Sequence, residues 1–386
     1  MKLAILHAGD LENLGLGGVD QYIKNIIRDK NENDITVFGT CVSGKYKLGE
    51  EYKVNREGLV YTFVPISDDR RYPLTIYYVF NEFKYLKKIC DNDIIYAQRI
   101  ELSLPFIFNK SGQSKLVQII HGSSCYTTMH YRKFKSIIYE LAEKLSIKLA
   151  CKTYIVLMRN EFGVPYYKRK YKKYSSKIGY AKIPVNTNIF HSLNKTTCRN
   201  ILNLSKNDFL IMYGGRVENN PKRVLLLPDI ILKLTEKNKN IHLVVVGSGI
   251  DLKKLEEKLY STVDKSKYTI VGYLEDREKY VQYINACDIN INISEFEGTC
   301  TSSLESVACG IPVVSTDTGD IGLFVENGKN GFLVSNESES KIIKESVFAL
   351  ESLMEHRMVM TDDYMQYDCH LVVKELFEEF KALNIK

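Results

Sequence analysis

The chain has 386 residues, a length that favours two domains over one large core. Hydrophobic residues make up 45% and charged residues 26%, ordinary globular values that argue against extensive disorder or a fibrous repeat. The net charge of +6 is unevenly spread, because residues 1–185 hold 30 Lys and Arg against 18 Asp and Glu, a net charge of +12, while the remainder carries −6.

Short apolar runs rich in Val and Ile alternate with longer segments of helical periodicity along the chain. This alternation is typical of a parallel sheet with helices on both faces. In the first half we predict strands at residues 3–6, 35–39, 59–64, 94–97, 115–120 and 153–157. The second half repeats the pattern, with predicted strands at residues 209–213, 242–246, 269–271, 289–293, 312–315 and 331–334. The expected fold class is α/β with two doubly wound parallel sheets.

Proline and consecutive turn formers interrupt both periodicities at residues 183–190, where we place the hinge. The predicted domains are therefore residues 1–185 and 186–367. A tail at about residues 368–386 has an apolar face at helical spacing and is expected to form a closing helix. The sequence of this helix does not determine which domain it packs on, and the N-terminal domain is the candidate.

A glycine-rich loop at residues 9–18 follows the first predicted strand and precedes a predicted helix. Its spacing is not that of the G-x-G-x-x-G fingerprint, and the second strand ends without the acidic residue that would bind a ribose. Both departures argue against a dinucleotide cofactor. Asp91 and Asp93 form an Asp-x-Asp sequence, but we do not predict a metal site there. The sequence precedes a strand and so lies at the amino edge of a parallel sheet, whereas ligands bind at the carboxyl edge.

The strongest group of polar residues lies at residues 294–314, where a predicted strand turns at Gly298 into a predicted helix. We expect Thr301 or Ser302 to cap this helix and Gly310 to end it. In open α/β sheets this position binds anionic ligands, so the backbone N–H groups here would donate to phosphate or sugar oxygens. Those groups belong to Thr299, Cys300, Thr301 and Ser302.

Two carboxylates, Glu297 and Glu305, flank the same turn. Either could accept hydrogen bonds from hydroxyl groups, one from a sugar and one from a ribose. Taken singly, each is better explained as a solvated residue, one in a turn and one on an exposed helix face. Together with the loop and helix, they predict a site for a nucleotide sugar.

The spacing of Glu297 and Glu305, followed by Ser-Val-Ala-x-Gly-x-Pro-Val-Val, resembles the donor-site signature of retaining glycosyltransferases of family 4. Gly214-Gly215-Arg216 followed by Lys222 is similar to the family's Gly-Arg and Lys pair, although the neighbouring Arg223 leaves open which cation faces the ligand. The resemblance is dense over residues 183–335. It implies the GT-B fold, in which two Rossmann-like domains face a central cleft.

The resemblance also implies residue roles. Fixed cations aimed at a diphosphate leaving group lower the barrier as its charge grows, so Arg216 and Lys222 would bind the diphosphate in place of a divalent metal. Glu297 would bind and orient the donor sugar, and His121 lies where the family has a histidine beside that sugar. The implied catalytic residues are Glu297, His121, Arg216 and Lys222. The implied donor-binding residues are Gly17, Gly18, Arg216, Lys222, Leu274, Glu297, Thr299, Cys300, Thr301, Ser302 and Glu305.

One departure concerns the donor loop. The family usually has Glu-Gly-Phe-Gly where this chain has Glu297-Gly298-Thr299-Cys300, so the loop lacks a glycine and a bulky aromatic residue. Backbone contacts can survive that exchange, but we expect a different shape for the sugar pocket.

Cysteine usage and hydropathy bear on location. Nine cysteines at irregular spacings without a C-x-x-C pair are typical of a reduced intracellular protein and form neither a zinc nor an iron–sulfur frame. The first apolar run is too short for a signal peptide, and no stretch approaches the roughly 20 apolar residues that cross a bilayer. Residues 166–177 concentrate cations and tyrosines, which fits either an anionic membrane surface or a solvated basic loop. No nucleic-acid-binding module accompanies them.

We therefore expect a retaining, metal-independent hexosyltransferase without a cofactor. It would move a sugar from a UDP- or GDP-linked donor to a glycan or lipid-linked acceptor in polysaccharide or glycolipid synthesis, in the cytoplasm or at the inner face of the plasma membrane. Two alternatives stay open: a GT-B nucleotide-sugar epimerase, and a non-enzymatic carbohydrate-binding subunit of a transferase complex. The sugar, the acceptor, the linkage and the oligomeric state are left undetermined.

Overall fold

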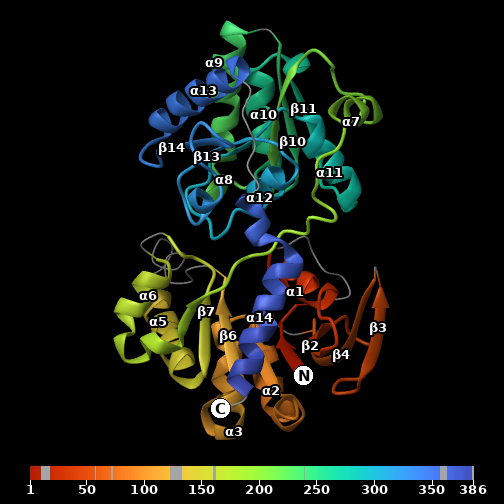
Figure 1. Cartoon of the computed structure of the whole chain (residues 1–386), viewed down its shortest axis with the longest axis vertical. Coiled ribbons are helices and arrows are strands. Elements are labelled where there is room, and N and C mark those ends of the chain that lie inside the picture. The colour runs from red at the N-terminus through yellow and green to blue at the C-terminus, as the bar shows by residue number, and fades with distance from the viewer. Residues whose placement is uncertain are drawn as a thin grey trace. The chain divides into compact units, whose positions relative to one another are not determined.

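The computed structural model describes residues 1–9, 18–56, 58–70, 73–121, 133–159, 162–238, 240–356 and 363–384. The chain forms two compact units (Figure 1). Met1–Pro184 and Cys369–Lys386 make the first unit, and Val185–Asp368 makes the second. Each unit contains one sheet with helices on both faces, which confirms the expected α/β class with two parallel sheets.

The sheet of the first unit has eight strands in the order β3-β4-β2-β1-β5-β6-β7-β8. The strands are β1 (Lys2–Leu6), β2 (Asp34–Cys41), β3 (Tyr52–Arg56), β4 (Leu59–Asp68), β5 (Ile94–Ala97), β6 (Leu116–Ile120), β7 (Lys152–Ile155) and β8 (Ile178–Tyr180). Neighbouring strands pair in parallel except β3 and β4, which are antiparallel. The sequence predicted these strands except β3 and β8. β3 is a largely exposed edge strand and β8 has only three residues, so neither shows a long apolar run.

Helices cover both faces of this sheet because successive strand residues point to opposite faces. Leu3 and Ile5 pack in the core beneath α1 and α14, whereas Ala4 and Leu6 pack in the core beneath α2 and η1. The helices of the unit are α1 (Gly18–Arg28), α2 (Leu74–Cys90), η1 (Ile100–Phe108), α3 (Lys110–Lys115), α5 (Lys133–Leu149), α6 (Val164–Lys170), η2 (Lys172–Lys177) and α14 (Cys369–Asn384). The C-terminal helix α14, blue in Figure 1, lies among the red and orange elements of this unit, with the Phe380 ring centroid 5.1 Å from that of Tyr96.

The sheet of the second unit has six parallel strands in the order β11-β10-β9-β12-β13-β14. The strands are β9 (Phe209–Gly214), β10 (Ile241–Val246), β11 (Tyr268–Gly272), β12 (Ile289–Asn292), β13 (Val313–Thr316) and β14 (Gly331–Val334). All six were predicted. The chain runs outward from β9 to β11 and then returns to start again at β12, so the topological switch point lies between β9 and β12.

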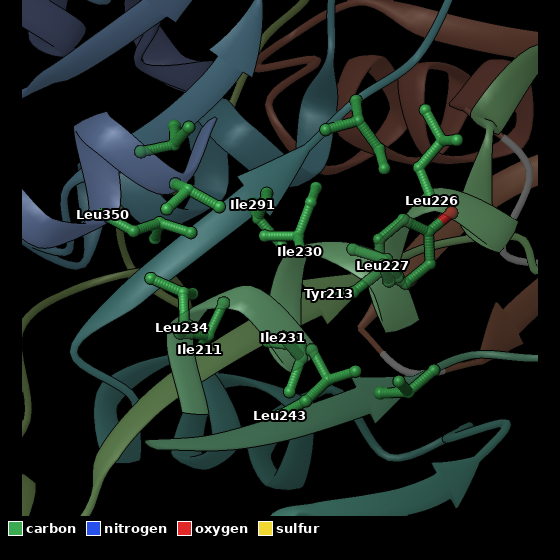
Figure 2. Close-up of a cluster of buried hydrophobic side chains, with 14 of the residues drawn as sticks. Ile211, Tyr213, Leu226, Leu227, Ile230, Ile231, Leu234, Leu243, Ile291 and Leu350 are labelled. Carbon is green, nitrogen blue, oxygen red and sulfur yellow. The ribbon is translucent and has the colours of Figure 1, made fainter. Parts of the chain in front are cut away.

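The core of the second unit is split by its sheet. Ile211 and Tyr213 pack with α9, α10 and α13 on one face (Figure 2), while Leu210 and Met212 pack with α11 and α12 on the other. The helices are α7 (Lys195–Ile201), α8 (Asn219–Lys222), η3 (Val224–Leu226), α9 (Leu227–Lys237), α10 (Leu252–Thr262), η4 (Lys265–Lys267), α11 (Arg277–Ala286), α12 (Thr301–Ala308), η5 (Ile321–Leu323), α13 (Glu339–Glu355) and η6 (Asp363–Tyr367). Loops that leave β9 and β12 therefore emerge side by side at the carboxyl edge of the sheet.

Candidate active site

A lysine and a glutamate meet at the switch point of the second sheet. Lys222 ends α8, which follows β9, and Glu297 lies in the loop after β12. The Lys222 Nζ donates to Glu297 Oε1 in an ion pair whose side chains are only 17% and 13% exposed. Burial lowers the pKa of Lys222, but the Glu297 carboxylate outweighs it and the pKa lies above its ordinary value. The pair brings together two predicted site residues that are 75 positions apart in the chain.

The structure distinguishes Lys222 from Arg223. Arg223 adopts a left-handed backbone conformation, with φ +51°, and turns its side chain away from Glu297. Its guanidinium donates to Asn336 Oδ1 and lies 4.0 Å from Glu295. Lys222 is therefore the cation beside Glu297, and Arg223 joins neighbouring loops.

Arg216 lies at the same edge but projects outward. Its side chain is 67% exposed and donates to Glu218 Oε2 at 3.0 Å. A hydrogen bond from the buried Tyr213 hydroxyl to the Arg216 carbonyl oxygen, 2.7 Å long, fixes the backbone of Arg216. The positive charge of Arg216 acts to lower the pKa of Lys222, against the larger effect of the Glu297 carboxylate. An exposed guanidinium above a half-buried ammonium can receive an anion from solvent.

Two glycine loops meet beside Arg216. Gly247 follows β10 with φ +148°, and a Cβ atom on it would lie 1.8 Å from the Gly215 carbonyl oxygen. A Cβ atom on Gly249 would lie 2.3 Å from the Val217 carbonyl oxygen. Only glycine allows the loops after β9 and β10 to approach this closely.

The helix after Glu297 starts differently from the prediction. We expected Thr301 or Ser302 to cap it, but α12 begins at Thr301 and its N-cap residue is Cys300, without a side-chain capping hydrogen bond. The Cys300 sulfur instead accepts from the Ser303 hydroxyl at 3.2 Å. Cys300 is 3% exposed, while Thr299, Thr301 and Ser302 are half-buried. The capping prediction was wrong because the sulfur of Cys300 engages groups beneath the helix.

Glu305 is held by an arginine that the sequence reasoning missed. The Arg277 Nη2 atom donates to Glu305 Oε1 at 2.6 Å. Burial raises the pKa of Glu305 and Arg277 opposes that rise. The guanidinium carbon lies 4.8 Å from the Phe190 ring centroid and 5.0 Å from that of Tyr280, so both rings make cation–π contacts with it. Glu305 is 14% exposed, so it is not the solvated helix residue of the alternative interpretation.

Leu274, the remaining predicted residue of this unit, follows β11 at the same edge. It is half-buried and packs against the core cluster beneath α11 and α12. The structure places it near the loops without bringing it to the Lys222–Glu297 pair by any described contact. It stays a predicted contact residue.

In the first unit, His121 follows β6 and lies in a polar cluster at the carboxyl edge of the sheet. Its Nε2 lies 2.9 Å from Gln98 Oε1, just beyond β5, and its ring packs edge-on against Tyr22. Burial lowers the pKa of His121 to about 3, and the nearby His7 adds to the depression, so the ring is neutral at physiological pH. His7 follows β1 and pairs through Nε2 with Asp20 Oδ1 at 2.9 Å. The sequence reasoning missed His7, although it directly follows the first predicted strand.

The other predicted residues of the first unit are placed as follows. Gly18 is the first residue of α1, and Gly17 lies outside the described residues. The Asp93 carboxylate accepts from the Lys2 backbone N–H at 2.7 Å, at the amino edge of the sheet. That location agrees with its exclusion as a metal ligand.

The basic segment at residues 166–177 has an internal and an exposed part. Lys170 and the hydroxyls of Tyr167 and Tyr171 surround the buried Glu143 of α5, with the Tyr171 hydroxyl 2.6 Å from its carboxylate. Lys177 donates to the Ala150 carbonyl oxygen at 2.7 Å. Four cations remain exposed, namely Lys168, Arg169, Lys172 and Lys173. Among the described residues, no helix has the length and apolar content needed to span a bilayer.

A family of known proteins matches most of the second unit. Residues 194–363 match the family described as Glycosyl transferases group 1. The matched segment contains the Lys222–Glu297 pair, Arg216 and Glu305. An uncharacterized glycosyltransferase of Methanocaldococcus jannaschii is 27% identical over 368 residues, which cover 90% of this chain and 87% of the relative.

Solved structures agree over nearly the whole chain. Sucrose-phosphate synthase from Thermosynechococcus elongatus aligns with a TM-score of 0.80 at 14% identity, over 99% of this chain and 98% of that chain. HepE of Anabaena in complex with UDP-glucose aligns with a TM-score of 0.71 at 14% identity, over 99% and 100%. The fold is that of the GT-B glycosyltransferases, as predicted.

Proposed function

We propose that the chain, whose residues 194–363 match the glycosyl transferases group 1 family, transfers a sugar from a nucleotide-diphosphate donor to an acceptor hydroxyl. The observation that carries the proposal is the half-buried Lys222–Glu297 pair at the switch point of that domain, with Arg216 exposed beside it. A UDP-linked donor is favoured over a GDP-linked one, because HepE was solved with UDP-glucose.

The proposed chemistry follows from charge. When the bond between the sugar and the diphosphate breaks, negative charge grows on the leaving phosphate, and fixed cations stabilise that charge more than they stabilise the ground state. The Lys222 ammonium has three N–H donors, so it can bind a phosphate oxygen and keep Glu297 in place. Arg216 can clamp the other phosphate through its planar fork.

The carboxylates take separate roles in this proposal. Glu297, held by Lys222, would accept hydrogen bonds from the donor sugar and orient it for attack. Glu305, with Oε1 occupied by Arg277, would accept from the ribose through its remaining capacity. The neutral His121 stays a proposed catalytic residue that acts by hydrogen bonding, as the resemblance to family 4 implies. We also propose that transfer retains the anomeric configuration of the sugar, as in family 4. Arg216 and Lys222 would bind the diphosphate in place of a metal ion.

The test combines donor binding with product analysis. Unfolding temperature is measured with UDP, GDP, UDP-glucose and GDP-mannose, since a ligand that binds only the folded state raises it. We expect one nucleotide class to stabilise the protein, and Arg216→Ala and Glu305→Ala to lose most of that stabilisation while staying folded. Chromatography of the nucleotide products then follows sugar release with and without a glycan acceptor.

Three outcomes would contradict the proposal. Absence of both stabilisation and donor consumption would exclude a nucleotide-sugar enzyme. Conversion of the donor into another sugar nucleotide without an acceptor would indicate an epimerase. Glycan binding without donor turnover would indicate a non-enzymatic carbohydrate-binding subunit.

We also propose that the acceptor is a glycan or a lipid-linked molecule at the inner face of the plasma membrane, in polysaccharide or glycolipid synthesis. Support comes from a surface where exposed cations and exposed apolar side chains adjoin. The cations lie on α6 and η2, and α5 carries three apolar side chains that are 58%, 56% and 64% exposed. These are Ile137, Ile138 and Leu141. The Lys170–Glu140 ion pair of 3.0 Å joins α6 to the same part of α5.

Vesicle sedimentation tests this surface. The protein is expected to sediment with phosphatidylglycerol-containing vesicles and to remain in solution with phosphatidylcholine alone. Each cation near an anionic surface contributes about 1 kcal/mol, so Lys168→Gln combined with Lys172→Gln should weaken binding roughly 30-fold. Lys233→Gln combined with Lys253→Gln removes the same charge from exposed positions of the second unit and serves as the control. Equal losses in both pairs would remove the membrane proposal.

A further inference from the structure

A group of buried polar side chains lies directly beneath Glu297. Asn292 ends β12 and Ser294 follows it, and Cys300 lies across from both at the start of α12. The three are 4%, 0% and 3% exposed. The Ser294 Oγ lies 2.7 Å from Glu297 Oε1 and 2.6 Å from Asn292 Oδ1, and the Asn292 amide nitrogen lies 3.1 Å from the Cys300 sulfur. These contacts form a continuous path from the sulfur to the carboxylate.

Counting hydrogens gives this path a direction. The Ser294 hydroxyl has a single hydrogen, yet both Glu297 and Asn292 present oxygen atoms to it. Glu297 also accepts from the Lys222 ammonium, so it behaves as a carboxylate and the Ser294 hydrogen belongs to it. The Ser294 oxygen then needs a donor, and the Asn292 amide supplies one after a half-turn that exchanges its nitrogen and oxygen.

The half-turn places the Asn292 oxygen against the Cys300 sulfur, where the thiol hydrogen can meet it. Ser303 is arranged to support this, because its hydroxyl donates to the sulfur from the other side at 3.2 Å. Burial raises the pKa of Cys300, and Glu297 adds to the rise, so the thiol keeps its hydrogen at neutral pH. Before the half-turn, the Asn292 nitrogen also donates to Ser315 Oγ at 3.3 Å, and the Ser315 hydroxyl donates to the Thr316 carbonyl oxygen. The half-turn therefore requires the Ser315 hydroxyl to rotate and donate to the Asn292 oxygen instead. With that rotation, every group from the thiol to Glu297 has the hydrogen that its neighbour requires.

We propose that Cys300, Asn292 and Ser294 form a directed chain of hydrogen bonds, from thiol to amide to hydroxyl, that ends on Glu297 and sets the orientation of its carboxylate. All three are positioning residues, since they act through Glu297. The consequence for donor binding rests on the proposed function, in which Glu297 binds the donor sugar. A sulfur donor at residue 300 also accounts for the use of cysteine at a helix N-cap where serine, threonine or aspartate is usual.

The direction of the chain can be tested without any ligand. The infrared S–H stretching band of Cys300 is identified as the band lost in Cys300→Ser. We expect that band at the lowered frequency of a donating thiol, and we expect it to move to the frequency of a free thiol in Asn292→Ala. A Cys300 band already at the free-thiol frequency in the wild-type protein would overturn the chain, as would a band that Asn292→Ala leaves unmoved.

The effect on donor binding is measured by calorimetry with UDP and UDP-glucose, with GDP and GDP-mannose in parallel. Ser294→Ala should weaken binding of the sugar nucleotide about tenfold, because a hydrogen bond to a charged group is lost, and should leave binding of the free nucleotide within about twofold. Cys300→Ala should also weaken binding of the sugar nucleotide. Cys300→Ser should restore that binding, because a hydroxyl donates where the thiol did.

The variants separate positioning from packing and from the proposed function. Equal losses in Cys300→Ala and Cys300→Ser, or equal losses for nucleotide and sugar nucleotide, would show that residue 300 acts by packing and would overturn the positioning role. A wild-type protein that binds none of the four probes but shows the lowered thiol band would contradict the proposed function and leave the hydrogen-bond chain standing.

Discussion

Lys222→Met is expected to lower kcat/KM for sugar transfer by about 10²- to 10³-fold, the usual effect of losing one fixed group at a developing charge. Lys222 is the half-buried cation beside Glu297, and methionine keeps its length without its charge. The loss should fall on both kcat and KM, because the ammonium would bind the diphosphate before and during departure. Both constants are measured by steady-state kinetics, with the nucleotide sugar that stabilises the protein in the thermal assay as the donor.

Two matched variants show whether the loss is electrostatic. Arg223→Met removes the adjacent cation, whose side chain turns to Asn336 and Glu295, and should keep most of the activity. Lys222→Met also leaves Glu297 without its ammonium, a cost of about 1–3 kcal/mol in stability. Adding Glu297→Gln should recover that stability and leave the enzyme inactive. Wild-type kcat/KM in Lys222→Met, or equal losses at both cations, would remove Lys222 from the site.

The contrast between Lys222 and Arg223 marks a limit of sequence reasoning. Both are basic residues after the same strand, and a pattern of residue types cannot separate them. Their separation comes from one left-handed residue, Arg223, which sends consecutive side chains in different directions. Backbone conformation of this kind depends on the loops packed around it, so no local signal predicts it.

The strands were predictable for the opposite reason. A parallel strand buried on both faces is largely apolar along its length, so β9 and β10 stand out as nearly continuous apolar runs, whereas β12 alternates isoleucine with asparagine. The order of these runs also places their loops at one edge of the sheet, which is how Lys222 and Glu297 could be assigned to one site. Strands without that burial, such as the exposed β3, leave no comparable trace.

Partners of the site residues were the least predictable part. Arg277 reaches Glu305 from 28 positions away, and the turn of helix that carries it shows nothing unusual in sequence. Asn292 ends β12, in which isoleucine and asparagine alternate, and Ser294 belongs to the turn after it, where polar residues are ordinarily explained as strand ends. Their role depends on distances of 2.6–2.7 Å between side chains, which only the packed structure provides.

Gly319→Ala is expected to lower kcat/KM by about 10²-fold, as small displacements of catalytic groups do, while the protein stays folded. Gly319 has φ +57°, and a Cβ atom on it would lie 2.0 Å from the Gly298 carbonyl oxygen and 2.6 Å from that of Glu297. The segment around it supports the turn that carries Glu297. Thr316 donates to the Ser294 carbonyl oxygen at 2.6 Å, and the Asp320 N–H donates to that of Gly298 at 3.0 Å.

A methyl group at residue 319 therefore cannot be accommodated unless the Glu297–Gly298 turn moves, and movement of that turn separates Glu297 from Lys222. Gly328→Ala is the matched control, because Gly328 also has a positive φ, +79°, but its Cβ would meet nothing within 4 Å. Both variants carry the backbone cost of a left-handed alanine, roughly 1–2 kcal/mol, so both unfolding temperatures should fall, and that of Gly319→Ala should fall further because the turn must move. Only Gly319→Ala should also lose donor turnover. Equal activities in the two variants would show that the turn carrying Glu297 does not depend on close packing against Gly319.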